Sequence, residues 1–324
     1  MTNSISNTTF KFKVSSEQVK EMIEYYSGYL ITNTSNYTIA RAKVSNATIT
    51  FYRTNVVLFQ GSGAKKEYLH WAEAFNLEIE EMPEFEENDY SELSVIGTDE
   101  VGTGDYFGPV VVCATYVSNE NIAKLRQLGV KDSKMLTDKQ IIPLSLEIAQ
   151  LVPYSIIYLD AEKLNLLSKK EYNLNFVKAY LHNKSINSIL KKHPEVKYDA
   201  ILIDEFTPKE KYLEYLKNTQ NVISNITTIK RGEQAHIAIA ASSILARAAF
   251  LREIQKISKE YDMPILKGAG SEVDRCAISF VKSFGWKEFF KVAKIKFANT
   301  TRIKEYFLNN PLPKSRQEGY DKFM

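Results

Sequence analysis

Two apolar runs in this 324-residue chain, SVIGT and YDAILI, each lead directly into acidic residues. Asp99 and Glu100 follow the first run, and Asp204 follows the second. Carboxylates beside buried strands are unfavourable unless they are paired or bind a metal. Adjacent strands lie only about 5 Å apart, so these acids can share a divalent cation if the two strands are neighbours.

Adjacent residues of a regular strand point to opposite faces. Asp99 and Glu100 can therefore both reach one ion only if the strand ends or twists there, and the glycines at 102 and 104 would permit this. We expect the strand to end at the two acids. A further carboxylate comes from Glu233, which stands just before the predicted long helix 237–257.

The ligands in this pattern are all oxygen atoms, which favours a hard cation, Mg²⁺ or Mn²⁺, over zinc. Clustered carboxylates with such ions are typical of phosphoryl transfer, in which two metals activate water and stabilise the leaving oxygen. The four histidines have no metal-binding spacing, and we expect His236 to be structural or exposed. No P-loop is present, and the glycines at 102, 104 and 108 do not match the dinucleotide fingerprint.

The composition, 44% hydrophobic and 25% charged, is that of a globular protein and excludes low-complexity and disordered classes. No apolar run approaches the roughly 18 residues that cross a bilayer, and the first residues do not resemble an export signal. Two cysteines fit a reducing compartment. We therefore expect a cytoplasmic protein without a membrane partner.

Charge is distributed unevenly along the chain. Residues 1–66 contain eight Lys/Arg and three acids, residues 78–92 contain eight acids and no base, and the chain from Leu93 onward contains 34 bases and 26 acids. The acidic segment includes Pro83 and shows no clear periodicity, which indicates a linker. We predict two domains, 1–88 and 89–324.

The first domain shows alternating and helical patterns in the order β-α-β-β-β-α. Its predicted elements are the strands 9–14, 37–44, 47–53 and 56–60 and the helices after Ser15 and at 64–75. Bases alternate along the strands at positions 11, 13, 41, 43 and 53. Such a pattern is often a solvated face, but few acids compensate it, which favours nucleic-acid contact. Tyr37 and Tyr52 are candidate exposed aromatics, with core packing as the alternative.

The second domain is predicted to be α/β with a mixed sheet. Strands are expected at 94–98, 109–117 and 198–203, and the long helix 237–257 begins with small residues that would let it pack closely on the sheet. Acids at strand ends occupy the positions where such folds place their sites.

Several segments together resemble the type 2 ribonucleases H. These are TDEVGTGDYFGP at 98–109, VKDSK at 130–134 with Leu136 and Thr137, Ile203-Asp204, KRGE at 230–233, AASSILAR at 240–247, GAG at 268–270 and AKIKFANT at 293–300. Gly-Thr-Gly in place of Gly-Arg-Gly, together with the extra N-terminal domain, resembles the bacterial ribonuclease HIII branch rather than HII. Ser242 departs from the alanine expected there.

The resemblance implies a ribonuclease-H-like mixed sheet with flanking helices, preceded by a domain similar to half of the TATA-box-binding protein. It implies an endoribonuclease that uses Mg²⁺ or Mn²⁺ to hydrolyse the RNA strand of RNA–DNA hybrids, leaving 5′-phosphate and 3′-hydroxyl ends. The acidic quartet then falls on Asp99, Glu100, Asp204 and Glu233, which would hold the metal and perform catalysis. No protein partner is implied, and we expect a monomer.

Substrate contacts are expected from Gly102, Thr103 and Gly104, whose amides could meet the 2′-hydroxyl that distinguishes RNA. Ser133 and Lys134 are candidates for phosphate contact, with a plain surface charge as the alternative for Lys134. Three other functions remain open: excision of single ribonucleotides from DNA, as by ribonuclease HII, a non-catalytic hybrid-binding protein, and a metal-dependent DNA nuclease.

Overall fold

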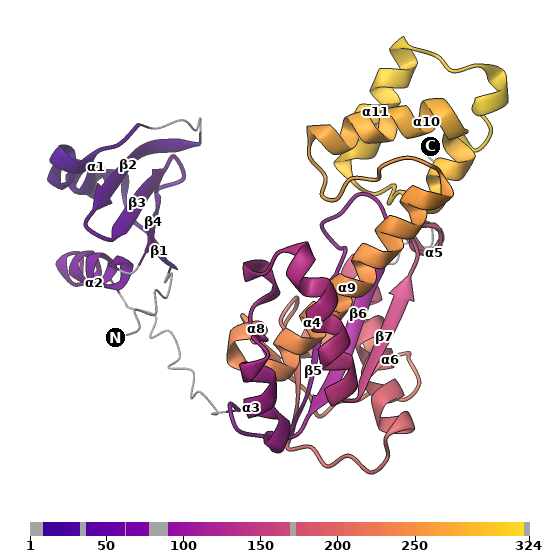
Figure 1. The fold of residues 1–324 in the computed structure, drawn as a ribbon. Coiled ribbons are helices and arrows are strands. Elements are labelled where there is room, and N and C mark those ends of the chain that lie inside the picture. The colour runs from indigo at the N-terminus through magenta and orange to yellow at the C-terminus, as the bar shows by residue number, and fades with distance from the viewer. Residues whose placement is uncertain (1–8, 33–36, 62, 78–89, 169–172, 321–324) are drawn as a thin grey trace. The chain divides into compact units, whose positions relative to one another are not determined.

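A computed structural model describes residues 9–32, 37–61, 63–77, 90–168 and 173–320. The chain divides into two compact units, Met1–Glu86 and Glu87–Met324, each with its own hydrophobic core. The acidic segment predicted as a linker lies outside the described residues, except for its last three positions. Figure 1 shows the elements of both units.

The N-terminal unit is an antiparallel sheet of four strands with two helices on one face. Ser15 caps the first helix, because its hydroxyl accepts from the Gln18 amide at 3.2 Å and the Gln18 side chain accepts from the Ser15 amide at 2.8 Å. The strands are ordered β1-β4-β3-β2. The predicted β-α-β-β-β-α order is confirmed by β1 (Thr9–Lys13), α1 (Ser16–Tyr25), β2 (Thr38–Val44), β3 (Ala47–Tyr52), β4 (Val56–Gln60) and α2 (Ala64–Ala74).

The strand register of this unit separates an apolar face from a basic one. Phe10, Phe59 and Ile49 pair in one row across β1, β4 and β3, and all three are buried beneath the helices. The next row runs from Lys11 across the two central strands to Arg41. Because successive side chains alternate between faces, this second row lies on the face that the helices do not cover.

The larger unit is built on a mixed sheet in the order β7-β6-β5-β8-β9. β5, β6 and β7 are antiparallel neighbours, whereas β8 and β9 run parallel to β5. The strands are β5 (Val95–Val101), β6 (Val110–Val117), β7 (Tyr154–Leu159), β8 (Ala200–Asp204) and β9 (Thr227–Ile229). β5 and β8 are thus parallel neighbours near the centre of the sheet, as the sharing of a cation by their acids requires.

Helices cover both faces of this sheet (Figure 1). α9 lies across β5 and β6 with α4 beside it, and α6 covers the opposite face with α7 against it. α10 and α11 follow α9 and form a C-terminal helical layer. None of the described helices is long and apolar enough to cross a membrane. The bounds are α3 (Asn119–Gln127), α4 (Asp138–Leu151), α5 (Ala161–Ser168), α6 (Leu174–Lys192), α7 (Lys209–Leu216), α8 (Gly232–Ala235), α9 (Ile237–Glu260), α10 (Ser271–Val292) and α11 (Ala298–Asn309).

The start of α9 touches the backbone of β5 because position 97 has no side chain. A Cβ atom on Gly97 would lie 2.5 Å from the Ile239 nitrogen and 2.6 Å from the Ala238 carbonyl carbon. Ser242 uses this close approach, since its hydroxyl donates to the Gly97 carbonyl at 2.8 Å. The serine at the position where alanine was expected therefore adds a link between helix and sheet.

We predict that Gly97→Ala destabilises the larger unit by about 3 kcal/mol or more, because the new methyl group would meet helix backbone that cannot yield locally. Gly104→Ala is the control, since a Cβ there has nothing within 4 Å; we expect a change within about 0.5 kcal/mol. Denaturant unfolding of the full chain measures both. Equal stabilities of the two variants would contradict the packing argument.

Candidate active site

Asp99 and Glu100 lie inside β5 rather than at its end. The strand continues to Val101 and keeps a regular register with β6, in which Asp99 pairs with Cys113 and Glu100 with Val112. The expectation that the strand ends at the two acids is therefore wrong. Because the pleat is regular, the two side chains point to opposite faces of the sheet.

Three of the four candidate acids share the face that α9 covers. Gly97 pairs with Leu202, which belongs to the core on that side. Two residues further along both strands, Asp99 and Asp204 therefore lie on the same face. Glu233 comes from α8, the short helix that packs against β8 and α9.

Burial and like charge govern this group of three. Asp99 is 6% exposed, and its pKa is raised well above the usual value by burial and then by the charges of Glu100, Asp204 and Glu233. The pKa values of Asp204 and Glu233 are also raised, in both cases mainly by burial. These carboxylates are costly to ionise together, so a cation among them would be stabilising.

Backbone amides fix two of these acids. The Gly232 amide donates to Asp204 Oδ1 at 2.7 Å, and the Ser133 amide donates to Glu233 Oε2 at 2.5 Å. Both donors lower the pKa of the acid that they contact, but burial outweighs them. The backbone therefore orients the carboxylates without neutralising their charge.

Glu100 points to the other face, where α6 compensates it. Lys178 Nζ donates to Glu100 Oε1 and His182 Nε2 donates to Oε2, both at 2.9 Å. Phe206 stacks on the His182 ring, and the centroid of its ring lies 4.2 Å from Lys178 Nζ. Thr98 Oγ1 lies 2.5 Å from His182 Nδ1. Burial alone would raise the pKa of Glu100, but the hydrogen bond and charge of His182 and the charge of Lys178 outweigh it and lower the pKa.

The acidic quartet thus consists of three acids whose pKa values stay raised, although the exposed Lys134 lies 3.9 Å from Glu233, and one acid that the protein keeps ionised. Lys178 and His182 were not among the sequence candidates. Their signal is their spacing: they lie four residues apart, and so on one face of α6. That face is otherwise apolar and buried, with Val177 and Leu181 beside them. Two basic residues in such a setting indicate a buried acid as their partner.

The donor set suits a hard divalent cation. Asp99, Asp204 and Glu233 supply only carboxylate oxygens, the ligands that Mg²⁺ and Mn²⁺ prefer, and their raised pKa values show negative charge in need of compensation. Across the part of the chain that the structure describes, no three acidic, histidine or cysteine side chains are already drawn together as a ligand set. Asp99, Asp204 and Glu233 would have to move their side chains closer together to hold one cation.

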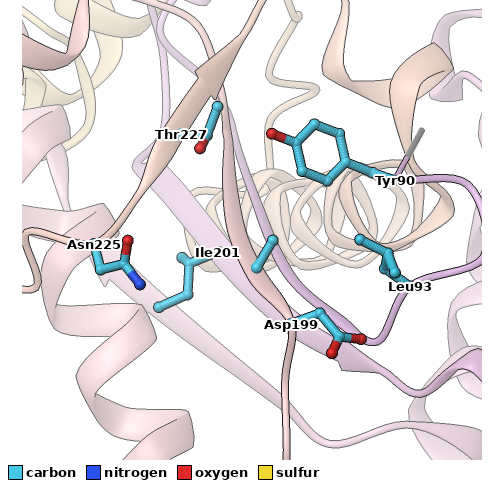
Figure 2. A pocket seen from close by; sticks show the side chains of 7 residues that line it. Tyr90, Leu93, Asp199, Ile201, Asn225 and Thr227 are labelled. Atoms are coloured by element: carbon cyan, nitrogen blue, oxygen red, sulfur yellow. The ribbon is translucent and has the colours of Figure 1, made fainter. Parts of the chain in front are cut away.

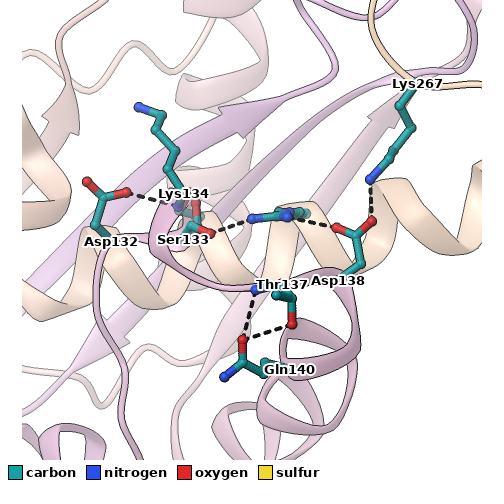
Figure 3. A network of polar contacts seen from close by, with 9 residues as sticks. Asp132, Ser133, Lys134, Thr137, Asp138, Gln140 and Lys267 are labelled. Carbon is teal, nitrogen blue, oxygen red and sulfur yellow. Dashed lines mark hydrogen bonds and ion pairs between the residues drawn. The ribbon is translucent and has the colours of Figure 1, made fainter.

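The loop before α4 contacts Glu233 through the Ser133 amide, and Figure 3 shows the network of polar contacts around this loop. Ser133 is buried, and its hydroxyl lies 2.8 Å from the Ser243 hydroxyl, while its carbonyl accepts from Arg247. Arg247 also donates to Asp138, which accepts from Lys267 as well. Lys134 is 84% exposed with Nζ 3.9 Å from Glu233 Oε1. The loop thus fixes the Glu233 carboxylate through the Ser133 amide and leaves the Lys134 side chain exposed to solvent.

The glycine turn after β5 is shaped by Gly102. Its φ is +92°, and a Cβ there would lie 2.2 Å from the Pro109 carbonyl oxygen, so only glycine fits. Thr103 is half-buried and Gly104 is exposed, with open space where a Cβ would stand. The turn therefore offers bare backbone at the surface beside Asp99.

Other candidates take structural positions. His236 is buried and caps α9, since its Nδ1 accepts from the Ala238 amide at 3.0 Å. Glu205, the residue after Asp204, has its Oε1 3.9 Å from Lys230 Nζ. A cavity of about 360 Å³ (Figure 2), lined by Tyr90, Leu93, Asp199, Ala200, Ile201, Asn225 and Thr227, lies at the opposite ends of β5 and β8. This cavity is separate from the acidic site.

The family model "Ribonuclease HII" matches residues 96–300, which include all four acids, and "Domain of unknown function (DUF3378)" matches residues 9–80. Ribonuclease HIII of Enterococcus faecalis is 40% identical over 90% of this chain and 97% of its own length. Ribonuclease HIII of Bacillus cereus (strain AH187) is 37% identical over 93% of this chain and 98% of its own.

Solved structures give the same result. The crystal structure of Bst-RNase HIII in complex with Mn²⁺ matches with a TM-score of 0.67 and 32% identity, covering 92% of this chain and 99% of that one. Ribonuclease H2 from Pyrococcus horikoshii OT3, at 22% identity and a TM-score of 0.57, covers 67% of this chain and 100% of its own and shows the shared fold. The predicted fold class is thus confirmed. With curated relatives at 37–40% identity over most of its length, the chain belongs to the ribonuclease HIII family.

Proposed function

We propose that this chain is an endoribonuclease that hydrolyses the RNA strand of RNA–DNA hybrids with Mg²⁺ or Mn²⁺, leaving 5′-phosphate and 3′-hydroxyl ends. The observation that carries the proposal is the group of three acids with raised pKa values on one sheet face, in a chain whose relatives are named ribonuclease HIII. We further propose that it acts as a monomer in the cytoplasm.

Asp99, Asp204 and Glu233 would hold the metal, with Glu100 as the fourth acid of the quartet. When bound by these residues, metal ions would supply an activated water and would stabilise the leaving 3′-oxygen. Glu100 is ionised and held through both oxygens, and Glu233 is oriented by the Ser133 amide. One of these two glutamates orients the attacking water.

The glycine turn would recognise the RNA strand. The turn of Gly102, Thr103 and Gly104 follows the strand of Asp99 and exposes its backbone at Gly104, and a 2′-hydroxyl can both donate to and accept from backbone groups. Lys134 has the exposure needed to reach a phosphate beside the acids. Ser133 has its side chain buried against Ser243, so its contribution to phosphate binding would pass through the placement of Lys134.

The uncovered sheet face of the N-terminal unit would bind the duplex without reading its sequence. Lys11, Lys13 and Lys43 are exposed and Arg41 is partly exposed, and they lie on the two edge strands. Thr50 and Leu58 occupy the row between Lys11 and Arg41. Bases on both edge strands of one sheet face suit the two phosphate backbones of a duplex.

We predict that the wild-type chain cuts an RNA–DNA hybrid, and that Asp99→Asn reduces the rate by on the order of 10³-fold or more, because it removes a metal-binding charge. The same change should raise the melting temperature in EDTA by about 2–4 °C, as it removes a costly buried charge. Gel assays and thermal scans measure the two effects. Wild-type cleavage by Asp99→Asn would refute the site.

Substrate choice separates the alternative functions. Preference for duplex DNA containing one ribonucleotide would favour a ribonuclease HII-like activity, and cleavage of all-DNA duplex would indicate a DNA nuclease. Hybrid binding without cleavage at any Mg²⁺ or Mn²⁺ concentration would indicate a binding protein.

The metal requirement should depend on pH. The pKa values of Asp99, Asp204 and Glu233 are raised, so protons compete with the metal at a higher pH than at ordinary carboxylates. As the pH is lowered from 8, we expect the half-saturating Mn²⁺ concentration to begin to rise at a higher pH than it would for acids of ordinary pKa, by up to about tenfold per unit for each proton displaced. Titration calorimetry at several pH values measures this. A constant Mn²⁺ affinity would contradict the raised pKa values.

The basic sheet face can be tested by charge removal. The triple variant Lys11→Ala, Arg41→Ala, Lys43→Ala should weaken hybrid binding and lower the slope of log Kd against log salt by up to about three. A control with the same net charge change, Lys20→Ala, Lys65→Ala, Lys66→Ala, alters the helices that cover the other face. Anisotropy titrations compare them. Equal losses in both variants would show a general charge effect.

A further inference from the structure

The segment between α10 and α11 runs alongside the glycine turn. The Gly108 amide donates to the Val292 carbonyl and the Lys294 amide donates to the Tyr106 carbonyl, both at 2.9 Å. Phe107 and Ala293 form the bridge between the two segments. The C-terminal helical layer is thus attached to the backbone that follows Gly104.

Lys294 adds two further bonds at this junction. Its Nζ donates to the Asp105 carbonyl at 2.6 Å and to the Phe107 carbonyl at 3.1 Å. Together with its backbone amide on Tyr106, this single residue binds three successive carbonyls of the turn. A side chain that holds the carbonyls on both sides of Tyr106 fixes the course of the backbone there.

The side chain of Lys294 is costly to bury. It is 2% exposed, and burial lowers its pKa to about 7, although the charge of Asp105 opposes this shift. Its nitrogen contacts carbonyl oxygens rather than a carboxylate. An apolar residue would fill the space at lower cost, so hydrophobic packing does not explain a lysine here.

The turn is also held from its other side, which leaves a distinct task for Lys294. The Gly268 amide donates to Asp105 Oδ1 at 2.6 Å, and the Tyr106 amide donates to the Gly268 carbonyl at 2.8 Å. These bonds fix a side chain and an amide of the turn. Lys294 fixes its carbonyls, directly after the exposed Gly104.

We propose that Lys294 is a positioning residue for substrate recognition: it holds the Gly102–Gly104 backbone in the conformation that receives the RNA strand. The C-terminal layer, which supplies Lys294, is then part of the recognition machinery. This inference rests on the proposed cleavage of RNA–DNA hybrids.

The test compares Lys294→Met with Phe307→Leu in the full chain. Phe307 is a buried residue of α11 that packs on Trp286, so its change lowers the stability of the same layer. At a temperature where both variants are folded, Lys294→Met should raise the KM for hybrid about five- to tenfold with kcat nearly unchanged. Phe307→Leu should keep the wild-type KM.

Two further measurements examine the hydrogen bonds of Lys294 and the mobility of the turn. Lys294→Gln retains N–H donors without the charge, so its KM should lie closer to the wild-type value than that of Lys294→Met. Hydrogen exchange of the amides at 102–108 should be faster in Lys294→Met but not in Phe307→Leu. Unchanged exchange and KM in Lys294→Met would overturn the inference. Absence of hybrid cleavage by the wild-type chain would overturn the proposed function. The exchange rates of the amides at 102–108 would still show whether Lys294 fixes the backbone of the turn.

Discussion

The pleat of β5 is the constraint on which the site depends. Asp99 and Glu100 are adjacent in a strand that stays regular through Val101, so they cannot face the same way. Each acid therefore meets a different helical layer, Asp99 the start of α9 and Glu100 the basic pair on α6. The same pleat in β8 brings Asp204 to the face of Asp99. The alternation of side chains thus separates Glu100, on the α6 face, from the other three acids of the quartet, on the α9 face.

This division gives the acids different electrostatic roles. Lys178 and His182 satisfy both oxygens of Glu100, and its pKa falls. The three acids on the α9 face receive only a few hydrogen bonds, and their pKa values rise. A buried acid whose two oxygens both contact bases is a fixed anion, whereas buried acids whose charge is offset only in part form a site for cations from solution. The proposed mechanism uses both kinds.

Much of this arrangement follows from local patterns in the sequence. The alternation in β1 and the cap at Ser15 predicted their elements within a residue or two. The apolar runs before Asp99 and Asp204 predicted two strands, and the structure shows that these strands are neighbours. The extent of β5 could not be predicted in the same way, because its continuation past Glu100 depends on pairing with β6. Contacts between segments far apart in the sequence could not be predicted for the same reason. Lys178, which contacts Glu100, is 78 residues away from it in the sequence.

The distribution of charge links metal binding to substrate binding. Three partly or fully buried acids whose charge Lys134 offsets only in part would repel the phosphates of a nucleic acid, and this repulsion is strong at short range in a low-dielectric setting. The bases of the N-terminal sheet face attract the same polyanion over a longer range. The surface bases can therefore hold a duplex before the acidic site is ready for it, but a scissile phosphate can approach Asp99 and Asp204 only when cations offset their charge. In the proposed function, metal ions thus govern both the chemistry and the entry of the RNA strand, and the near-neutral total charge of +3 reflects two opposed local fields.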